Sequence, residues 1–289
     1  MESKEILTIP FVLNEKISNI CTYKTQGKVK GVFYPQNEKQ LILVYDWLYN
    51  AKIPFKIIGN GSNLLIKEDC KCLFISTKQI KSNILLRNNY AYISSSTLLA
   101  NCFNKCYKKG LSGFENLATI PATIGGALTM NASCFGSSIF DIVEKIKIYK
   151  DGKEKFIKKD NILYCYHKTN LKDCLILSAK FKLKNENPCE ILNKYAQIVK
   201  IRTEKQPKGL SCGSVFKNPP NTSAGALIEK CGLKGLTKNN AKISEKHGNF
   251  IINTGNSTFD DIKYLIDKCQ EEVYRKFNIY LEKEVEIIQ

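Results

Sequence analysis

The stretch FKIIGNGSNLLIK, from Phe55 to Lys67, decides how this chain folds. The apolar run Phe55–Ile58 predicts a strand. A second run, Leu64–Ile66, begins directly after five glycine, asparagine and serine residues, Gly59–Asn63. Such a turn offers several backbone N–H groups with little side-chain bulk, so it can approach phosphate groups closely. It lacks the Lys-Ser/Thr ending of a P-loop and the third glycine of the dinucleotide fingerprint. Because Asn-Gly is also a strong hairpin signal, a plain hairpin turn is the alternative.

Length and composition indicate a globular protein. The 289 residues allow one or two domains, and 43% hydrophobic with 25% charged residues is typical of soluble proteins. No apolar run approaches the roughly 20 residues that span a bilayer, and the N-terminus lacks a secretory-signal pattern. We therefore expect a cytoplasmic protein without a membrane partner.

The cysteines do not form a metal-binding or disulfide pattern. There are 12 of them, with no C-x-x-C spacing, and the only histidines are His167 and His247. In a cytosolic chain such cysteines are mostly reduced and act as small apolar residues. We expect no metal site.

The net charge of +17 raises the possibility of nucleic-acid binding. However, the excess is nearly all lysine, whereas readers of bases and phosphates rely on arginine. The lysines are scattered, without a basic block or an aromatic-interleaved stripe. We expect solvated lysine-rich faces that attract polyanionic small molecules such as nucleotides, and no nucleic-acid partner.

The periodicity of apolar residues predicts an α+β fold with at least two lobes and a boundary near residue 200. Helices are expected at Leu41–Lys52, after an N-cap at Ser96, at Pro188–Glu204, Ala224–Cys231 and Thr258–Phe277. Strands are expected at Leu73–Ser76, Tyr90–Ser94, Ile142–Tyr149, Leu175–Leu183, Ser214–Lys217, Asn249–Asn253 and Ile279–Ile288.

Three further segments carry chemistry. In IPATIGGALTMNA, Ile120–Ala132, the pair Gly125-Gly126 suits close approach to a flat or phosphorylated ligand, or else packing against a helix. GSVFKNP, Gly213–Pro219, lacks the Gly-x-Ser-x-Gly elbow, so its serine is a proton donor, a ligand contact or an ordinary turn residue. In LEKEVEIIQ, three alternating glutamates would share one strand face, and solvated glutamates are the ordinary interpretation.

Together these segments resemble the UDP-N-acetylenolpyruvoylglucosamine reductase family, in its shorter form, from about Asn14 onward. The matching segments, in the family's order, are SNICTYKTQGKVKGVFYPQNEKQL, IIGNGSNLLI, GFENLATIPATIGGALTMNASCFG, YCYHKT, RTEKQPKGLSCGSVFKNPP, AGALIEKCGLKG, AKISEKHGNFIIN and LEKEVEII.

The resemblance implies an FAD-binding α+β fold of the vanillyl-alcohol-oxidase type. We expect FAD-binding subdomains at 1–80 and 81–200 and a substrate domain at 201–289, whose last strand returns to the active site. The turn would hold the FAD pyrophosphate, with the IPATIGGA loop along the same cofactor. The implied FAD contacts are Ile58, Gly59, Asn60, Gly61, Ser62, Asn63, Leu64, Ile120, Pro121, Thr123, Gly125, Gly126, Asn131 and Arg202.

The implied reaction passes hydride from NADPH to FAD and then to a UDP-sugar enolpyruvyl ether, in peptidoglycan precursor synthesis. Ser214 matches the family's proton donor, and Glu284 matches the carboxyl group near the substrate carboxylate. Burial should raise the pKa of that carboxyl, since a protonated carboxyl can assist an anion. The implied substrate contacts are Tyr166, Lys205, Lys217, Asn218 and His247.

The chain departs from the family at His167, where Tyr-Arg-x-Ser is usual and this sequence reads Tyr166-His167-Lys168-Thr169. The arginine is the expected cationic partner of the developing enolate, and we expect His167 to fill its catalytic role. A histidine keeps its charge only at lower pH, so the rate should fall more steeply above neutrality. Ala122, where glycine is common, should tighten the flavin loop without abolishing binding.

Three alternatives remain open at this stage. They are a flavoenzyme of the same fold with another substrate, an FAD- or UDP-sugar-binding relative that has lost turnover, and a basic nucleic-acid binder. The leading interpretation is a monomeric cytoplasmic reductase whose partners are NADPH and the enolpyruvyl sugar.

Overall fold

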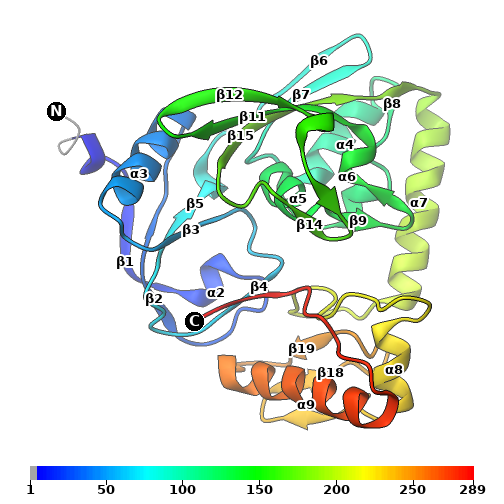
Figure 1. Ribbon diagram of the computed structural model, residues 1–289. Coiled ribbons are helices and arrows are strands. Elements are labelled where there is room, and N and C mark those ends of the chain that lie inside the picture. Colours follow the sequence, from blue (N-terminus) through cyan, green and yellow to red (C-terminus); the bar gives the residue numbers. More distant parts are fainter. Residues whose placement is uncertain (1–4) are drawn as a thin grey trace. The chain divides into compact units, whose positions relative to one another are not determined.

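The structure is a computed structural model that describes residues 5–289 (Figure 1). Its residues group into two compact units. Unit 1 contains Phe33–Asn60, Leu73–Ile201 and the described residues before Val12. Unit 2 contains Val12–Val32, Gly61–Cys72 and Arg202–Gln289. The sequence predicted three consecutive domains, at 1–80, 81–200 and 201–289, and these bounds stay a prediction. One predicted boundary, after residue 200, lies one residue from a boundary between the units, but the chain also changes unit at four earlier places.

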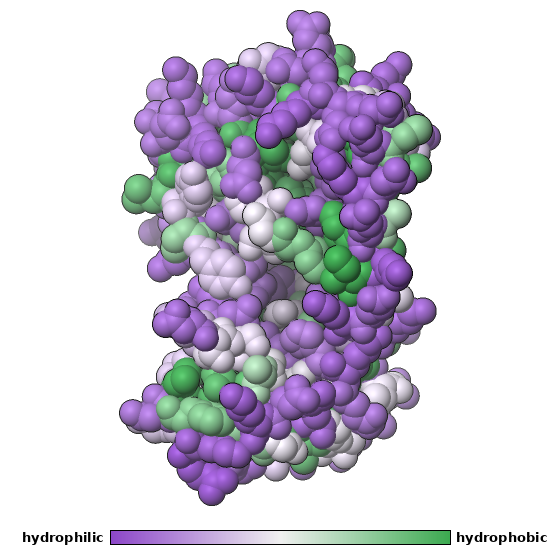
Figure 2. Space-filling view, turned by 90° about the vertical axis from the view of Figure 1, so that its right-hand side faces the viewer, coloured by the Kyte–Doolittle hydropathy of each residue, from purple (hydrophilic) through white to green (hydrophobic). Residues whose placement is uncertain are grey.

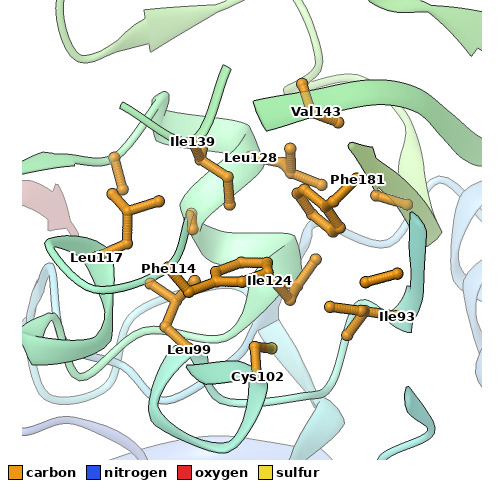
Figure 3. Close-up of a cluster of buried hydrophobic side chains, with 14 of the residues drawn as sticks. Ile93, Leu99, Cys102, Phe114, Leu117, Ile124, Leu128, Ile139, Val143 and Phe181 are labelled. Carbon is orange, nitrogen blue, oxygen red and sulfur yellow. The ribbon is translucent and has the colours of Figure 1, made fainter. Parts of the chain in front are cut away.

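Unit 1 is built on a five-stranded antiparallel sheet with the order β12-β11-β15-β7-β6. Two helices, α4 and α5, contribute apolar residues to the same core as the sheet (Figure 3). In that core Phe114 and Phe181 meet edge to face, with ring centroids 5.2 Å apart. The elements are β6 Ile84–Arg87, β7 Tyr90–Ser94, α4 Leu99–Tyr107, α5 Ile124–Met130, β11 Val143–Lys150, β12 Lys153–Lys158 and β15 Leu175–Lys182.

A second apolar cluster in unit 1 lies around helix α3, Glu38–Asn50, whose N-cap Asn37 accepts a hydrogen bond from the backbone of Gln40. Near it, β3, Phe55–Ile58, pairs in parallel with β5, Leu73–Ser76. The other elements of unit 1 are η1 Thr77–Gln79, β8 Leu111–Ser112, η2 Leu117–Thr119, β9 Ser133–Cys134, β10 Ser137–Ser138, α6 Ile139–Ile142, η3 Lys159–Asn161, β13 Tyr164–Cys165, β14 Lys168–Thr169 and β16 Lys184–Asn185. The long helix α7, Pro188–Lys205, begins in unit 1 and ends in unit 2.

Unit 2 packs the amphipathic helix α9, Phe259–Phe277, with α8, Ala224–Lys230, and a small antiparallel sheet. Thr258 caps α9 in a capping box with Asp261. The sheet has the order β17-β18-β19, and β4 and β20 form a separate parallel pair. The remaining bounds are β1 Phe11–Lys16, α2 Ile17–Ile20, β2 Lys28–Phe33, β4 Leu64–Ile66, β17 Thr237–Lys238, β18 Ala241–Ile243, β19 Ile251–Asn253 and β20 Glu286–Ile288.

These elements confirm an α+β fold but correct several local predictions. The hairpin alternative for Gly59–Asn63 is wrong, because β3 pairs with β5 whereas β4 pairs with β20. The predicted strand at Ser214–Lys217 is reduced to an isolated bridge at Phe216. The last strand is only Glu286–Ile288, so the three alternating glutamates do not share one strand. Helix α4 begins after Leu98, which caps it without a side-chain bond, and not after Ser96.

Most of the face shown in Figure 2 is polar, with apolar side chains in separate patches. Within residues 5–289, none of the helices combines the length and the apolarity that a bilayer span requires.

We predict that Phe114→Ala lowers the free energy of unfolding by about 3–5 kcal/mol, because it leaves a cavity beside Phe181. Phe114 is 1% exposed. Phe156→Ala is the matched control, since that ring is 62% exposed, and it should cost at most about 1 kcal/mol. Urea unfolding measures both variants, and equal losses would contradict the assignment of Phe114 to the core.

Candidate active site

The first half of the Gly-Asn-Ser turn lies against the IPATIGGA loop, within unit 1. The Asn60 side chain donates from Nδ2 to the carbonyl of Pro121 at 2.7 Å. A Cβ on Gly59 would meet Thr123 Oγ1 at 2.2 Å, so only glycine fits at this position. The two loops that the sequence assigned to one ligand therefore contact each other directly.

The second half of the turn is fixed within unit 2. Gly61 has a φ of +68°, and a Cβ there would lie 1.9 Å from the carbonyl oxygen of Ile20. The Gly61 carbonyl accepts a hydrogen bond from the backbone N–H of Thr22 at 3.1 Å. The thiols of Cys21 and Cys212 both donate to the carbonyl of Leu64 at 2.9 Å. These contacts determine the path of the backbone on both sides of Ser62.

Asn63 links the turn to the C-terminal segment. Its Nδ2 donates to the carbonyl of Glu284 at 3.0 Å, and its own carbonyl accepts from the N–H of Glu286 at 3.0 Å. The parallel pairing of β4 with β20 continues this contact. A residue expected to hold the cofactor is thus bonded to the backbone of a residue expected to act on the substrate.

Helix α5 organises the second predicted cofactor loop. Thr123 caps its N-terminus by accepting from the N–H of Gly126, and the N–H of Gly125 donates to the carbonyl of Ser95 at 2.8 Å. The helix ends at Asn131, which adopts the left-handed conformation with a φ of 44°. Asn131 donates from Nδ2 to the carbonyl of Cys165, whereas its buried Oδ1 has no hydrogen-bond partner among the described residues.

The hydrogen bond from Asn131 to the carbonyl of Cys165 connects the end of α5 to the hairpin that carries His167. Strands β13 and β14 are joined by the two residues Tyr166 and His167. His167 is buried, has a φ of 50°, and places Nε2 3.3 Å from Ser133 Oγ. The Tyr166 ring lies edge-on to the imidazole and is 49% exposed. Histidine is among the residue types that tolerate a left-handed conformation comparatively well.

In unit 2 the residue after Ser214 is bonded to the backbone of Glu284. The carbonyl of Val215, the residue after Ser214, accepts hydrogen bonds from the N–H groups of Glu284 at 2.8 Å and Val285 at 3.2 Å. Asn249 clamps the next residue, since its Oδ1 accepts from the N–H of Phe216 and its Nδ2 donates to the carbonyl of Phe216. Two segments 70 positions apart in the sequence are thereby held in a fixed register.

The Glu284 carboxyl is electrostatically unusual. Burial raises its pKa to about 7, although the positive charge of Lys217 acts in the opposite direction. A carboxyl with this pKa is protonated in about half of the molecules at neutral pH. Glu284 can therefore act as a hydrogen-bond donor where an ordinary glutamate only accepts.

The other predicted substrate contacts in unit 2 have distinct local roles. Asn218 Oδ1 accepts from the N–H of Ala224 at 3.1 Å and so holds the start of α8. His247 Nδ1 accepts from the N–H of Asn249 at 3.2 Å, and burial lowers the pKa of its imidazole. Lys205, at the end of α7, is exposed, and Arg202 is half-buried.

The residues present fit FAD. Glycine is sterically required at positions 59 and 61, and the buried Oδ1 of Asn131 accepts no hydrogen bond from residues 5–289. Close backbone approach and an unmatched acceptor are what a phosphorylated, polar cofactor needs. Within unit 1, the groups that would hold it are turn residues 58–60, the loop at 120–126 and Asn131.

Sequence reasoning missed two residues of this region. Asn249 lies in a segment that matches the family, but sequence reasoning assigned it no role, because that role depends on reaching Phe216. Glu282 was interpreted as a solvated strand residue. Only the register between the two segments shows that it lies opposite Lys217. The alternating glutamates of the C-terminal segment were the one sequence feature that pointed to Glu282.

We predict that Gly61→Ala destabilises the protein and lowers its bound flavin, because the new Cβ clashes with the Ile20 carbonyl. Gly136→Ala is the matched control. It has a similar φ of +77° but open space around it, so it should cost only about 1 kcal/mol of backbone strain. Flavin absorbance per protein and thermal unfolding measure both effects, and an equal flavin content in the two variants would contradict this prediction.

Comparisons with known proteins agree with an FAD-binding fold. A family model described as "UDP-N-acetylenolpyruvoylglucosamine reductase, C-terminal domain" matches residues 205–288, and one described as "FAD binding domain" matches residues 29–156. The UDP-N-acetylenolpyruvoylglucosamine reductase of Caldanaerobacter subterraneus subsp. tengcongensis is 36% identical over 281 residues, covering 96% of this chain and 93% of the relative. The enzyme of that name from Aquifex aeolicus is 35% identical and covers 96% of this chain and 95% of the relative.

A solved structure shares the fold. The crystal structure of UDP-N-acetylenolpyruvylglucosamine reductase from Thermus caldophilus matches with a TM-score of 0.81 and 29% identity, covering 97% of this chain and 99% of that chain. The match to full-length relatives at more than 30% identity establishes the relationship. The chain belongs to the UDP-N-acetylenolpyruvoylglucosamine reductase family, whose members are FAD-containing oxidoreductases.

Proposed function

We propose that this protein uses NADPH to reduce UDP-N-acetylglucosamine enolpyruvate to UDP-N-acetylmuramate in peptidoglycan precursor synthesis. Family membership supports the substrate class and FAD. The observation that carries the proposal is the backbone register that bonds Val215, the residue after Ser214, to Glu284, whose pKa burial raises to about 7.

The reaction adds one hydride and one proton across the enolpyruvyl double bond. FAD, held by Asn60 and the loop at 120–126, would supply the hydride, and NADPH would be the reductant that gives up the two electrons. Hydride addition at the terminal carbon leaves negative charge that spreads into the substrate carboxylate. A proton on the neighbouring carbon then completes the saturated lactyl ether, so the protein must stabilise an anion and deliver a proton.

Ser214 and Glu284 suit these two tasks. The Ser214 hydroxyl would donate the proton to the neighbouring carbon. The Glu284 carboxyl, when protonated, would donate a hydrogen bond to the substrate carboxylate as its negative charge grows. Deprotonation of Glu284 would place a second negative charge beside that anion, so this contribution is lost as the pH rises through the pKa of about 7.

His167 would take the place of the cationic arginine that is usual in the family. Its hairpin is anchored to α5 by Asn131 Nδ2, which donates to the Cys165 carbonyl, and by Thr169 Oγ1, which donates to the Thr129 carbonyl. The anchored turn fixes the direction of the imidazole. A neutral imidazole donates one hydrogen bond, and the protonated ring adds a full charge.

A second candidate function follows from the same substitution. A relative that binds FAD and the UDP-sugar without turnover is favoured by the loss of a permanent charge at position 167. It predicts a yellow protein that does not oxidise NADPH when the enolpyruvyl sugar is present.

The direct test measures NADPH oxidation by the purified flavoprotein, with and without UDP-N-acetylglucosamine enolpyruvate. We expect oxidation that depends on the sugar, and a loss of about 100-fold or more in Ser214→Ala because the proton donor is gone. Ser211→Ala, three residues away, is the matched control and should keep near-normal turnover. A flavin-loaded protein without sugar-dependent oxidation would support the second candidate instead.

We predict that the rate of the natural protein falls between about pH 6 and 8 and that His167→Arg makes this fall less steep. Histidine loses its charge in that range and arginine does not. The ratio of the His167→Arg rate to the rate of the natural protein should therefore be roughly 3- to 10-fold higher at pH 8 than at pH 6. Lys168→Arg is the control, because it changes the neighbouring residue without changing charge. A profile that is flat in the natural protein, or equally steep in His167→Arg, would contradict the role of His167.

A further inference from the structure

Lys217, Glu282 and Glu284 lie on one face of two paired segments. The N–H of Lys217 donates to the carbonyl of Glu282 at 2.9 Å, the N–H of Glu284 donates to the carbonyl of Val215, and Phe216 and Lys283 form the bridge between them. Opposite residues of an antiparallel pair share a face. Lys217 is therefore directly opposite Glu282 and diagonal to Glu284.

The Lys217 ammonium is bound by the first of these two glutamates. Nζ donates to Glu282 Oε1 at 2.6 Å. The lysine side chain is only 14% exposed, whereas the Glu282 side chain is 70% exposed. An ion pair with one strongly exposed partner contributes little to stability. The position of this pair beside Glu284 is therefore more informative than its strength.

The segment that carries the lysine is itself rigidly held. Val215 and Phe216 are each 1% exposed, and the Val215 N–H donates to the carbonyl of Asn249 while the Asn249 side chain clamps Phe216. Because the backbone cannot shift, the ammonium can change partner only by rotating the lysine side chain.

We propose that Glu282 is a positioning residue that holds the Lys217 ammonium on its own carboxylate and so keeps that ammonium from closing an ion pair with Glu284. The inference rests on the proposed role of Glu284 as a hydrogen-bond donor to the substrate carboxylate. Without Glu282, the ammonium of the diagonal lysine would be released to pair with an ionised Glu284.

The surrounding charges support this arrangement. Burial raises the pKa of Glu284 to about 7, and the charge of Lys217 already lowers it while the ammonium is held by Glu282. On these two segments the other charged side chains are Lys283, on the opposite face with Phe216, and Glu286, beyond the pairing where β20 begins. The neighbouring side chains of Asn63 and Asn249 are neutral and bond to backbone.

The test is a pH titration of the Glu284 carboxyl in the FAD-loaded protein by infrared spectroscopy, which distinguishes a protonated carboxyl from a carboxylate. The Glu284→Gln spectrum identifies the band. We expect Glu282→Gln to lower the midpoint by roughly one unit, because the released ammonium pairs with Glu284. Lys217→Met should raise the midpoint, and Glu282→Gln in the Lys217→Met background should add no further shift.

The matched controls are Asp267→Asn and Lys263→Met, from an ion pair on α9 with the same 2.6 Å separation and exposures of 52% and 27%. Both should leave the midpoint unchanged. A midpoint that stays constant or rises in Glu282→Gln, or a Glu284 band that does not titrate, overturns the positioning role. The titration needs no substrate, so sugar-dependent NADPH oxidation measured on the same samples separately tests the proposed function.

Discussion

The carbonyl of Val215, shared by the N–H groups of Glu284 and Val285, is the contact on which the proposed chemistry of unit 2 depends. It fixes the register between the segment after α7 and the C-terminal segment. This register puts Val215, the residue after Ser214, opposite Glu284 and Lys217 opposite Glu282. A shift by one residue would turn each of these side chains to the other face.

The same C-terminal segment also holds the cofactor turn. Asn63 bonds to the backbone of Glu284 and Glu286, so the turn and the proposed substrate groups share one set of hydrogen bonds. The turn can make these contacts because glycine is the only residue that fits at positions 59 and 61. The glycines of the turn are therefore required for close approach to the chain itself, apart from the close approach to a ligand that we propose.

Glu284 and His167, the two titratable groups of the proposed mechanism, gain their properties in different ways. Glu284 becomes protonatable near neutrality through burial, which penalises its charged form. His167 is the residue type that titrates in that range, and its place in a left-handed turn suits histidine. An enzyme with both groups would be tuned to neutral or slightly acidic conditions, because each is most useful when protonated.

The sequence alone determined the α+β class, the FAD-binding family and the two loops that meet at Asn60 and Pro121, because glycine spacing and motif order are local properties. It also located the helices α7 and α9, because their apolar residues recur over several helical turns. It did not determine that β3 and β4 pair with different strands, that Asn249 clamps Phe216, or that Glu282 binds Lys217. Those features depend on contacts between segments far apart in the chain, and only the tertiary structure decides which backbone groups meet and how deeply Glu284 is buried.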